Sequence, residues 1–222
     1  MTWNIPNILT LLRLLAAPGV VLMFLYFARP WADWFALILF VSAAVTDWFD
    51  GYLARSWKQE TKLGAMLDPI ADKAMVVIAL VVIVGYAGMD PWLLLPATLI
   101  IFREVFVSGL REFLGAQAGK LKVTKLAKWK TTVQMFAIGL LMLSSVIHPA
   151  EGHEPKNELI AQIVFYISLG IGGVGLLVLW TAAWFTIVTG WDYFRKGMPY
   201  IRQKEAAARK PAAAKPAPEP GE

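Results

Sequence analysis

Four of the seven aspartates in this chain fall between positions 47 and 72, where their spacing could support chemistry. Asp47 and Asp50 are three residues apart, and Asp68 and Asp72 are four apart, so each pair shares a face if its segment is helical. Only a short link separates the two segments, so they are predicted to be antiparallel neighbours whose acidic faces meet. Four facing carboxylates repel strongly in a medium of low dielectric, and a cation must therefore lie among them.

That cation is either a basic side chain, such as Lys73 or Arg55, or a divalent metal ion. Ligands that are all oxygen, without His or Cys, favour magnesium, manganese or calcium over zinc. Four carboxylates are enough for two metal ions of the kind that hold phosphoryl oxygens. Each aspartate taken alone also has a structural explanation that needs no metal. Asp68 precedes a proline, as is typical of a helix start, and Asp47 could lie at a helix end. The two facing pairs together favour a metal site.

The composition is that of a membrane protein. Of the 222 residues, 58% are hydrophobic and 17% are charged, whereas a soluble domain has about 45–50% apolar and about 25% charged residues. The hydrophobic content excludes a disordered chain, and the absence of cysteine excludes a disulfide scaffold, a zinc finger and a cysteine nucleophile. The net charge of +5 does not indicate nucleic-acid binding, because the basic residues lie between long apolar runs.

Six segments reach the length of about 20 residues that a membrane-spanning helix needs, which predicts an all-α integral membrane protein with six transmembrane helices. They are residues 8–28, 31–54, 69–87, 91–114, 131–147 and 159–190. The last is longer than one crossing requires, so it tilts, extends into the cytoplasm or breaks at its glycines near 170–175; we expect one span. Polar residues before the first segment predict a short interfacial helix there, not a signal peptide.

Basic residues set the orientation. Sixteen Lys and Arg residues lie in or beside the second and fourth connections and the C-terminal tail, against two (Arg29 and Lys156) on the other side. This bias predicts that both termini and the aspartates lie on the cytoplasmic side. We expect residues 1–200 to form the membrane domain and the Ala/Pro/Lys-rich residues 201–222 to form a disordered cytoplasmic tail.

The stretch from Asp47 to Asp72 resembles the signature of the CDP-alcohol phosphatidyltransferase family, D-x-x-D-G-x-x-A-R-x(8)-G-x(3)-D-x(3)-D, at all eight fixed positions. The resemblance implies transfer of a phosphatidyl group from CDP-diacylglycerol to an alcohol, with release of CMP. It further implies that Asp47, Asp50, Asp68 and Asp72 bind two Mg²⁺ or Mn²⁺ ions, and that Asp72 is also the general base. Six spans with cytoplasmic termini fit that family.

The same resemblance implies contacts to the nucleotide of CDP-diacylglycerol. Gly51 would leave room for the nucleotide, and Arg55 would bind a phosphate in forked geometry. Thr61 matches a position that contacts CDP in relatives, and Asn7 and Thr10 resemble a second nucleotide-contacting segment.

Basic residues in the fourth and fifth segments predict a binding site for a second phosphate group. Arg103 and Arg111 are eight residues apart and therefore point in nearly the same direction on a helix, while Lys128 and Lys130 open the next segment. The alternative is that Arg103 pairs with an acidic neighbour and Arg111 only extends to the interface. Glu104, being adjacent to Arg103, is not expected to face it.

Residues 4–13, 103–112 and 128–135 resemble the family's bacterial phosphatidylglycerophosphate synthases. The implied acceptor is sn-glycerol 3-phosphate, and the implied setting is the bacterial inner membrane, with a homodimer and no nucleic-acid partner. A synthase for inositol phosphate, serine or phosphatidylglycerol is the alternative within the family; inositol phosphate is also anionic and so also fits the basic residues. A divalent-cation transporter is the alternative outside it, but no ionisable residues continue to the other face.

Overall fold

In the computed structural model, residues 4–56, 61–120, 125–148, 153 and 155–209 are described, and all their regular secondary structure is helical. The elements are α1 (Ile5–Tyr26), α2 (Trp31–Ser56), α3 (Lys62–Tyr86), α4 (Pro91–Leu114), the 3₁₀ helix η1 (Gly115–Lys120), α5 (Lys125–Ile147) and α6 (Glu158–Arg209). The six α-helices coincide broadly with the six apolar segments of the sequence. The prediction of an all-α protein is confirmed for these residues.

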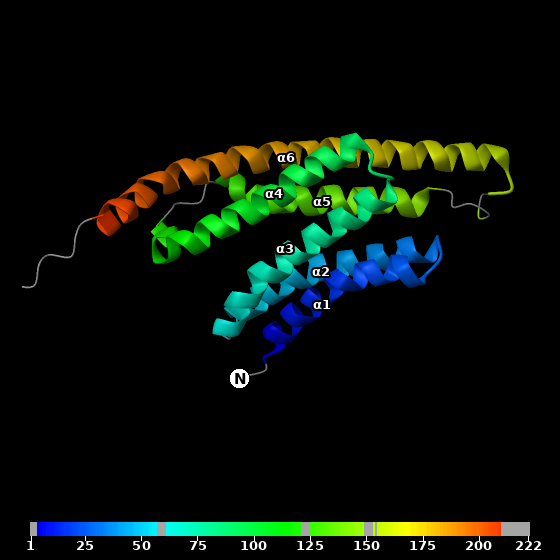
Figure 1. The fold of residues 1–222 in the computed structure, drawn as a ribbon. Helices are drawn as coiled ribbons and strands as arrows, with labels where there is room; N and C mark the ends of the chain where they lie inside the picture. Colours follow the sequence, from blue (N-terminus) through cyan, green and yellow to red (C-terminus); the bar gives the residue numbers. More distant parts are fainter. Residues whose placement is uncertain (1–3, 57–60, 121–124, 149–152, 154, 210–222) are drawn as a thin grey trace, which may run out of the picture.

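The helices form an elongated antiparallel bundle (Figure 1). α1 packs against α2 and α3, and α6 packs against α5 and α4. The two halves are joined by contacts of α5 with α2 and α3 and of α3 with α4. The start of α1 and the end of α6 lie at the same end of the bundle, as an even number of passes requires. That end also contains the starts of α3 and α5 and the ends of α2 and α4, and the polar residues discussed below come from it.

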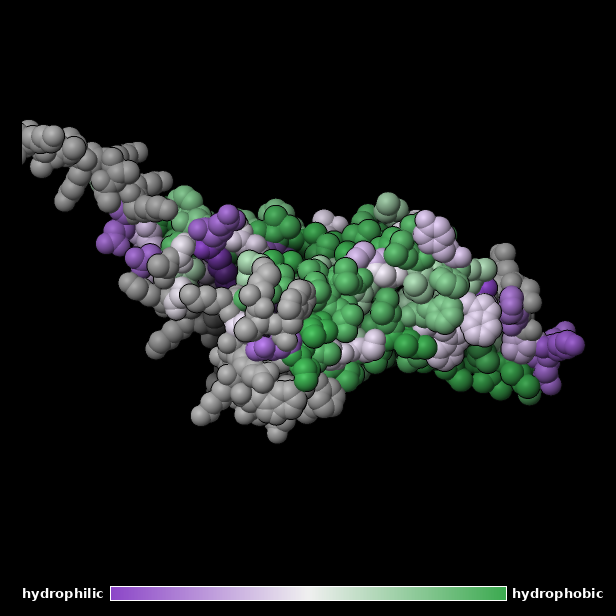
Figure 2. Space-filling view, turned by 90° about the horizontal axis from the view of Figure 1, so that it is seen from below, coloured by the Kyte–Doolittle hydropathy of each residue, from purple (hydrophilic) through white to green (hydrophobic). Residues whose placement is uncertain are grey.

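The surface of the bundle is suited to lipid. Figure 2 shows hydrophobic residues over the middle of one face and hydrophilic residues gathered towards its ends. Large apolar side chains are exposed on several helices, including Leu25 at 69%, Phe102 at 66% and Leu177 at 70%. Within the described residues, four helical stretches are long and apolar enough to cross a membrane: Asn7–Tyr26, Pro91–Leu114, Trp129–Ile147 and Glu158–Gln203. The chain is therefore a multi-pass membrane protein.

Two expectations about the ends of the chain differ from the structure. The short interfacial helix is not a separate element, because α1 is continuous from Ile5; a proline in its first turn loses no hydrogen bond there. α6 is a single helix of 52 residues, roughly 78 Å long at 1.5 Å per residue, and it continues past residue 200 to Arg209. The last part of α6 is rich in Ala, Lys, Glu, Gln and Arg, which are strong helix formers. Residues 210–222 of the predicted tail lie outside the described residues.

The glycines of α6 do not break the helix, and two of them, Gly172 and Gly175, bring it against α5. A Cβ atom on Gly172 would lie 2.8 Å from Oγ of Ser144, and one on Gly175 would lie 3.1 Å from Cγ of Leu141. Ser144 also donates a 2.8 Å hydrogen bond to the carbonyl of Ser168. Small residues that allow close backbone approach are typical of helix packing in membranes.

Candidate active site

Asp47 near the end of α2 and Asp72 in the first half of α3 meet at the side chain of Arg13 from α1. Nη1 of Arg13 donates to Oδ1 of Asp47 and, at 2.6 Å, to Oδ1 of Asp72. The side chain of Arg13 is 2% exposed, whereas those of Asp47 and Asp72 are 49% and 43% exposed. A buried cation thus holds two half-exposed carboxylates from different helices.

Asp68 lies one turn before Asp72 and is held by α1 as well. The hydroxyl of Thr10 donates a 2.7 Å hydrogen bond to Oδ1 of Asp68. Asn7, Thr10 and Arg13 follow one another at intervals of three residues, and all three are buried. One face of α1 therefore supplies polar side chains to the aspartates of its two neighbours.

Thr61 and Asn7 form the link between α1 and the start of α3. Thr61 caps α3 by accepting a 3.0 Å hydrogen bond from the backbone nitrogen of Gly64, and its hydroxyl donates to Oδ1 of Asn7 at 2.8 Å. A Cβ atom on Gly64 would lie 2.8 Å from Oδ1 of Asn7. The glycine of the signature therefore allows Asn7 to reach the cap.

Arg13 is the residue that the sequence analysis did not place in the site. Its signal was available: an arginine in an apolar helix needs a partner, and its spacing from Asn7 and Thr10 puts it on their face. Lys73, which we considered as the cation, instead donates to the hydroxyl of Ser108.

Three predicted site residues on α2 cannot be compared with the structure. Asp50, Gly51 and Arg55 lie within α2, but their side chains are outside the described residues, as is that of Lys128 on α5. Among the acidic, histidine and cysteine side chains that are described, no three form a group that could hold a metal ion.

The chemistry of the described carboxylates nevertheless fits a hard divalent cation. Asp47, Asp68 and Asp72 offer only oxygen atoms as ligands, and within the described residues these three carboxyl groups gather around Thr10 and Arg13. CDP-alcohol phosphatidyltransferases generally use divalent metal ions.

A second polar site adjoins the first through Asp72. A cavity of about 220 Å³ between α3, α4 and α5 is lined by Asp72 and by four cationic residues. These are Lys73, Arg103, Arg111 and Lys130. The predicted acceptor residues Arg103, Arg111 and Lys130 thus share one cavity with the predicted general base.

Glu104 organises two of these cations. Lys130 donates to Oε1 of Glu104, and Nη1 of Arg103 lies 3.3 Å from the same oxygen. The expectation that Arg103 and Glu104 do not pair was wrong, because their long side chains bring Nη1 and Oε1 within 3.3 Å although the two residues are adjacent. This pairing matches the alternative considered for Arg103. Its Nη2 also lies 3.4 Å from the hydroxyl of Thr189, while its Nε has no hydrogen-bond partner among the described residues.

Among the described residues, Arg111 is held by an aromatic ring and not by a carboxylate. Its guanidinium carbon lies 5.3 Å from the ring centroid of Tyr193 on α6, a distance suited to a cation–π interaction. Arg111 is exposed and lines the cavity, so its N–H groups can turn towards an anion there.

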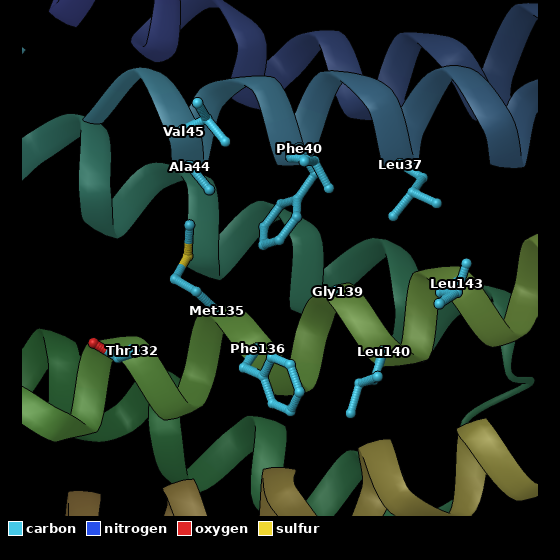
Figure 3. Close-up of a pocket in the computed structure, with 11 residues that line it drawn as sticks. Leu37, Phe40, Ala44, Val45, Thr132, Met135, Phe136, Gly139, Leu140 and Leu143 are labelled. Carbon is cyan, nitrogen blue, oxygen red and sulfur yellow. The ribbon is translucent and has the colours of Figure 1, made fainter. Parts of the chain in front are cut away.

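An apolar groove runs beside these polar sites. It has a volume of about 640 Å³ and lies between α2 and α5. Figure 3 shows Phe40 of α2 and Met135 of α5 reaching into the space between the two helices. Val45 and Thr132, which also line it, are two residues from Asp47 and Lys130 respectively, so this end of the groove lies at about the same level along the helices as the two polar sites.

Comparison with known proteins agrees with this arrangement. The family model for CDP-alcohol phosphatidyltransferases matches residues 3–188. A relative from Cereibacter sphaeroides, named CDP-diacylglycerol–glycerol-3-phosphate 3-phosphatidyltransferase, is 62% identical over 92% of this chain and 100% of its own length. Relatives with the same name from Pectobacterium atrosepticum and Rickettsia bellii are 48% and 40% identical, over 88% and 89% of this chain and 93% and 97% of their own lengths. The chain belongs to the CDP-alcohol phosphatidyltransferase family.

Proposed function

We propose that this protein transfers the phosphatidyl group of CDP-diacylglycerol to sn-glycerol 3-phosphate, giving phosphatidylglycerophosphate and CMP. The observation that carries the proposal is the position of Asp72, which belongs to the aspartate cluster and also lines the cationic cavity. One carboxylate thus lies between a site suited to a metal-bound pyrophosphate and a site suited to an anionic alcohol. The names of the relatives support the same reaction.

The donor is held by its nucleotide and by its acyl chains. Asp47, Asp50, Asp68 and Asp72 would hold two Mg²⁺ or Mn²⁺ ions, whose positive charge would offset the negative charge of the pyrophosphate and of the departing CMP. Asn7, Thr10, Gly51, Arg55 and Thr61 would contact the nucleotide. One acyl chain would occupy the groove between α2 and α5, because that groove is apolar and begins two residues from Asp47.

The acceptor is held by its phosphate. Arg103, Arg111, Lys128 and Lys130 would bind the phosphate of sn-glycerol 3-phosphate, and the unpartnered Nε of Arg103 supplies one donor. The free primary hydroxyl then attacks the phosphorus of the phosphatidyl group. The new P–O bond forms as the bond to CMP breaks, and the hydroxyl proton passes to Asp72.

This reaction needs a site at a membrane surface, since one substrate is a lipid and the other is soluble. α2 and α3, at 26 and 25 residues, are long enough to span the bilayer beside the four apolar helices, and this length supports our proposal of six spans. The positive charge around the site supports the proposal that the site and both termini lie on the cytoplasmic side of the bacterial inner membrane. We also propose that the protein forms a homodimer.

A panel of acceptors tests the function. Purified protein with Mg²⁺ or Mn²⁺ should release CMP from CDP-diacylglycerol when sn-glycerol 3-phosphate is present, and not with inositol phosphate, serine or phosphatidylglycerol. Equal turnover with another acceptor would contradict the assignment of glycerol phosphate. Transport of Mn²⁺ into proteoliposomes without CMP release would instead identify a transporter.

A further inference from the structure

Gln134 is a buried polar residue in the cationic cavity to which the proposed reaction gives no role. It lies on α5, one turn after Lys130, and is 2% exposed. It lines the same cavity as Asp72, Arg103 and Arg111. Its Nε2 is buried and has no hydrogen-bond partner among the residues that the structure describes.

A buried N–H group without a partner is costly and uncommon, so the carboxamide is suited to a ligand that brings an acceptor oxygen. The charged donors of the cavity come from Lys73, Arg103, Arg111 and Lys130, and these are suited to phosphate oxygens. The amide of Gln134 is a neutral donor, and it suits a neutral oxygen such as that of a hydroxyl group.

The position of Gln134 indicates which part of the acceptor molecule would lie beside its N–H donor. Residues 130 and 134 are separated by about 6 Å along the helix axis, and Gln134 is the deeper of the two in the bundle. A three-carbon phosphate can bridge that distance, with its phosphate at Lys130 and its carbon chain beside Gln134. The attacking hydroxyl is then directed to Asp72, which lines the same cavity from α3.

We propose that Gln134 donates a hydrogen bond to the second hydroxyl of the acceptor, the one that does not react, and so makes the enzyme select a diol phosphate over a mono-alcohol phosphate. This inference rests on the proposed function and adds a residue that determines acceptor specificity. A site built to bond a substrate hydroxyl discriminates against the analogue that lacks it, because the buried donor is then left unpaired.

The test compares sn-glycerol 3-phosphate with 3-hydroxypropyl phosphate, which keeps the reacting hydroxyl and the phosphate but lacks the second hydroxyl. The wild-type protein should prefer sn-glycerol 3-phosphate by about tenfold or more in kcat/KM. Gln134→Met should lose roughly that factor with sn-glycerol 3-phosphate and should keep kcat/KM for 3-hydroxypropyl phosphate within about twofold. Gln134→Leu, which also removes the N–H donors and adds no charge, should also lose the preference.

Gln162→Met is the matched control. Gln162 is exposed near the start of α6, at the opposite end of the bundle from the start of α3 (Figure 1), and this variant should retain the wild-type preference. If both Gln134 variants keep the preference, or lower kcat/KM equally for both acceptors, Gln134 does not contact the second hydroxyl. If the wild-type protein does not use sn-glycerol 3-phosphate at all, the proposed function fails, and this inference fails with it.

Discussion

Nη1 of Arg13 lies 2.6 Å from Oδ1 of Asp72, so a cation buried in the first helix holds a carboxylate of the third. The same nitrogen also binds Asp47 on the second helix. The position of the proposed general base therefore depends on a residue 59 positions earlier in the chain, outside the family signature.

Replacing Arg13 should make the stability of the protein depend on divalent metal. Arg13→Gln leaves Asp47 and Asp72 without their shared cation, which should lower the free energy of unfolding by about 2 kcal/mol and the melting temperature by roughly 5 °C. Added Mn²⁺ should raise the melting temperature of the variant more than that of the wild type. Equal shifts in both proteins would show that Arg13 and the metal do not neutralise the same carboxylates.

Asp72→Asn should remove turnover and leave the fold intact. The amide keeps the shape of the side chain but accepts no proton, so CMP release should fall by about 10²–10⁴-fold. Asp90→Asn is the control: Asp90 caps α4 at the opposite end of the bundle, and asparagine caps a helix equally well. A turnover of Asp72→Asn close to that of the control would exclude Asp72 as the base.

Arg111→Ala should raise the KM for sn-glycerol 3-phosphate by about 10- to 100-fold, because a charge-assisted contact to the phosphate is lost. The KM for CDP-diacylglycerol should not change. Arg195 is an exposed arginine on α6 that does not line the cavity, so Arg195→Ala provides the comparison. An unchanged acceptor KM in Arg111→Ala would leave Arg111 with only its contact to Tyr193.

Gly64→Ala should reduce activity by disturbing the link between α1 and α3. The added methyl group would lie 2.8 Å from Oδ1 of Asn7 and 3.3 Å from Oγ1 of Thr61, so the Asn7–Thr61 hydrogen bond should weaken. We expect a loss of about 1 kcal/mol in stability and a higher KM for CDP-diacylglycerol. Gly85→Ala, on the same helix with no atom within 4 Å of the added carbon, should behave like the wild type. Identical behaviour of the two variants would contradict this function of Gly64.

Gly139→Leu should narrow the apolar groove. A Cβ atom on Gly139 meets no described atom within 4 Å, so a leucine can extend into the groove without disturbing the packing of the helices. The KM for CDP-diacylglycerol with long acyl chains should rise severalfold, whereas that for a dihexanoyl donor should not. Gly170→Leu, at an exposed position on α6 that is equally open, should change neither KM. A parallel rise for both donors in Gly139→Leu would show that no acyl chain lies there.

Much of the fold could be predicted from the sequence, because a long apolar segment in a membrane has few alternatives to a helix. The helix boundaries were less predictable. In the sequence, the glycines of α6 were compatible with either a break in the helix or a packing surface. Only the structure shows that two of them, Gly172 and Gly175, pack against Ser144 and Leu141. Similarly, the helix formers of residues 201–209 allow a helix, but only the structure shows that α6 continues through them.

The sequence by itself determined the chemistry that is available: aspartates at helical spacing, basic residues in the fourth and fifth segments, and no cysteine. Only the tertiary structure decided which of these groups meet. Arg13 and not Lys73 reaches Asp47 and Asp72, and Arg103 and Lys130 share Glu104. The physical reason is that helical periodicity fixes the face of each side chain on its own helix, whereas partners across helices depend on how the helices pack.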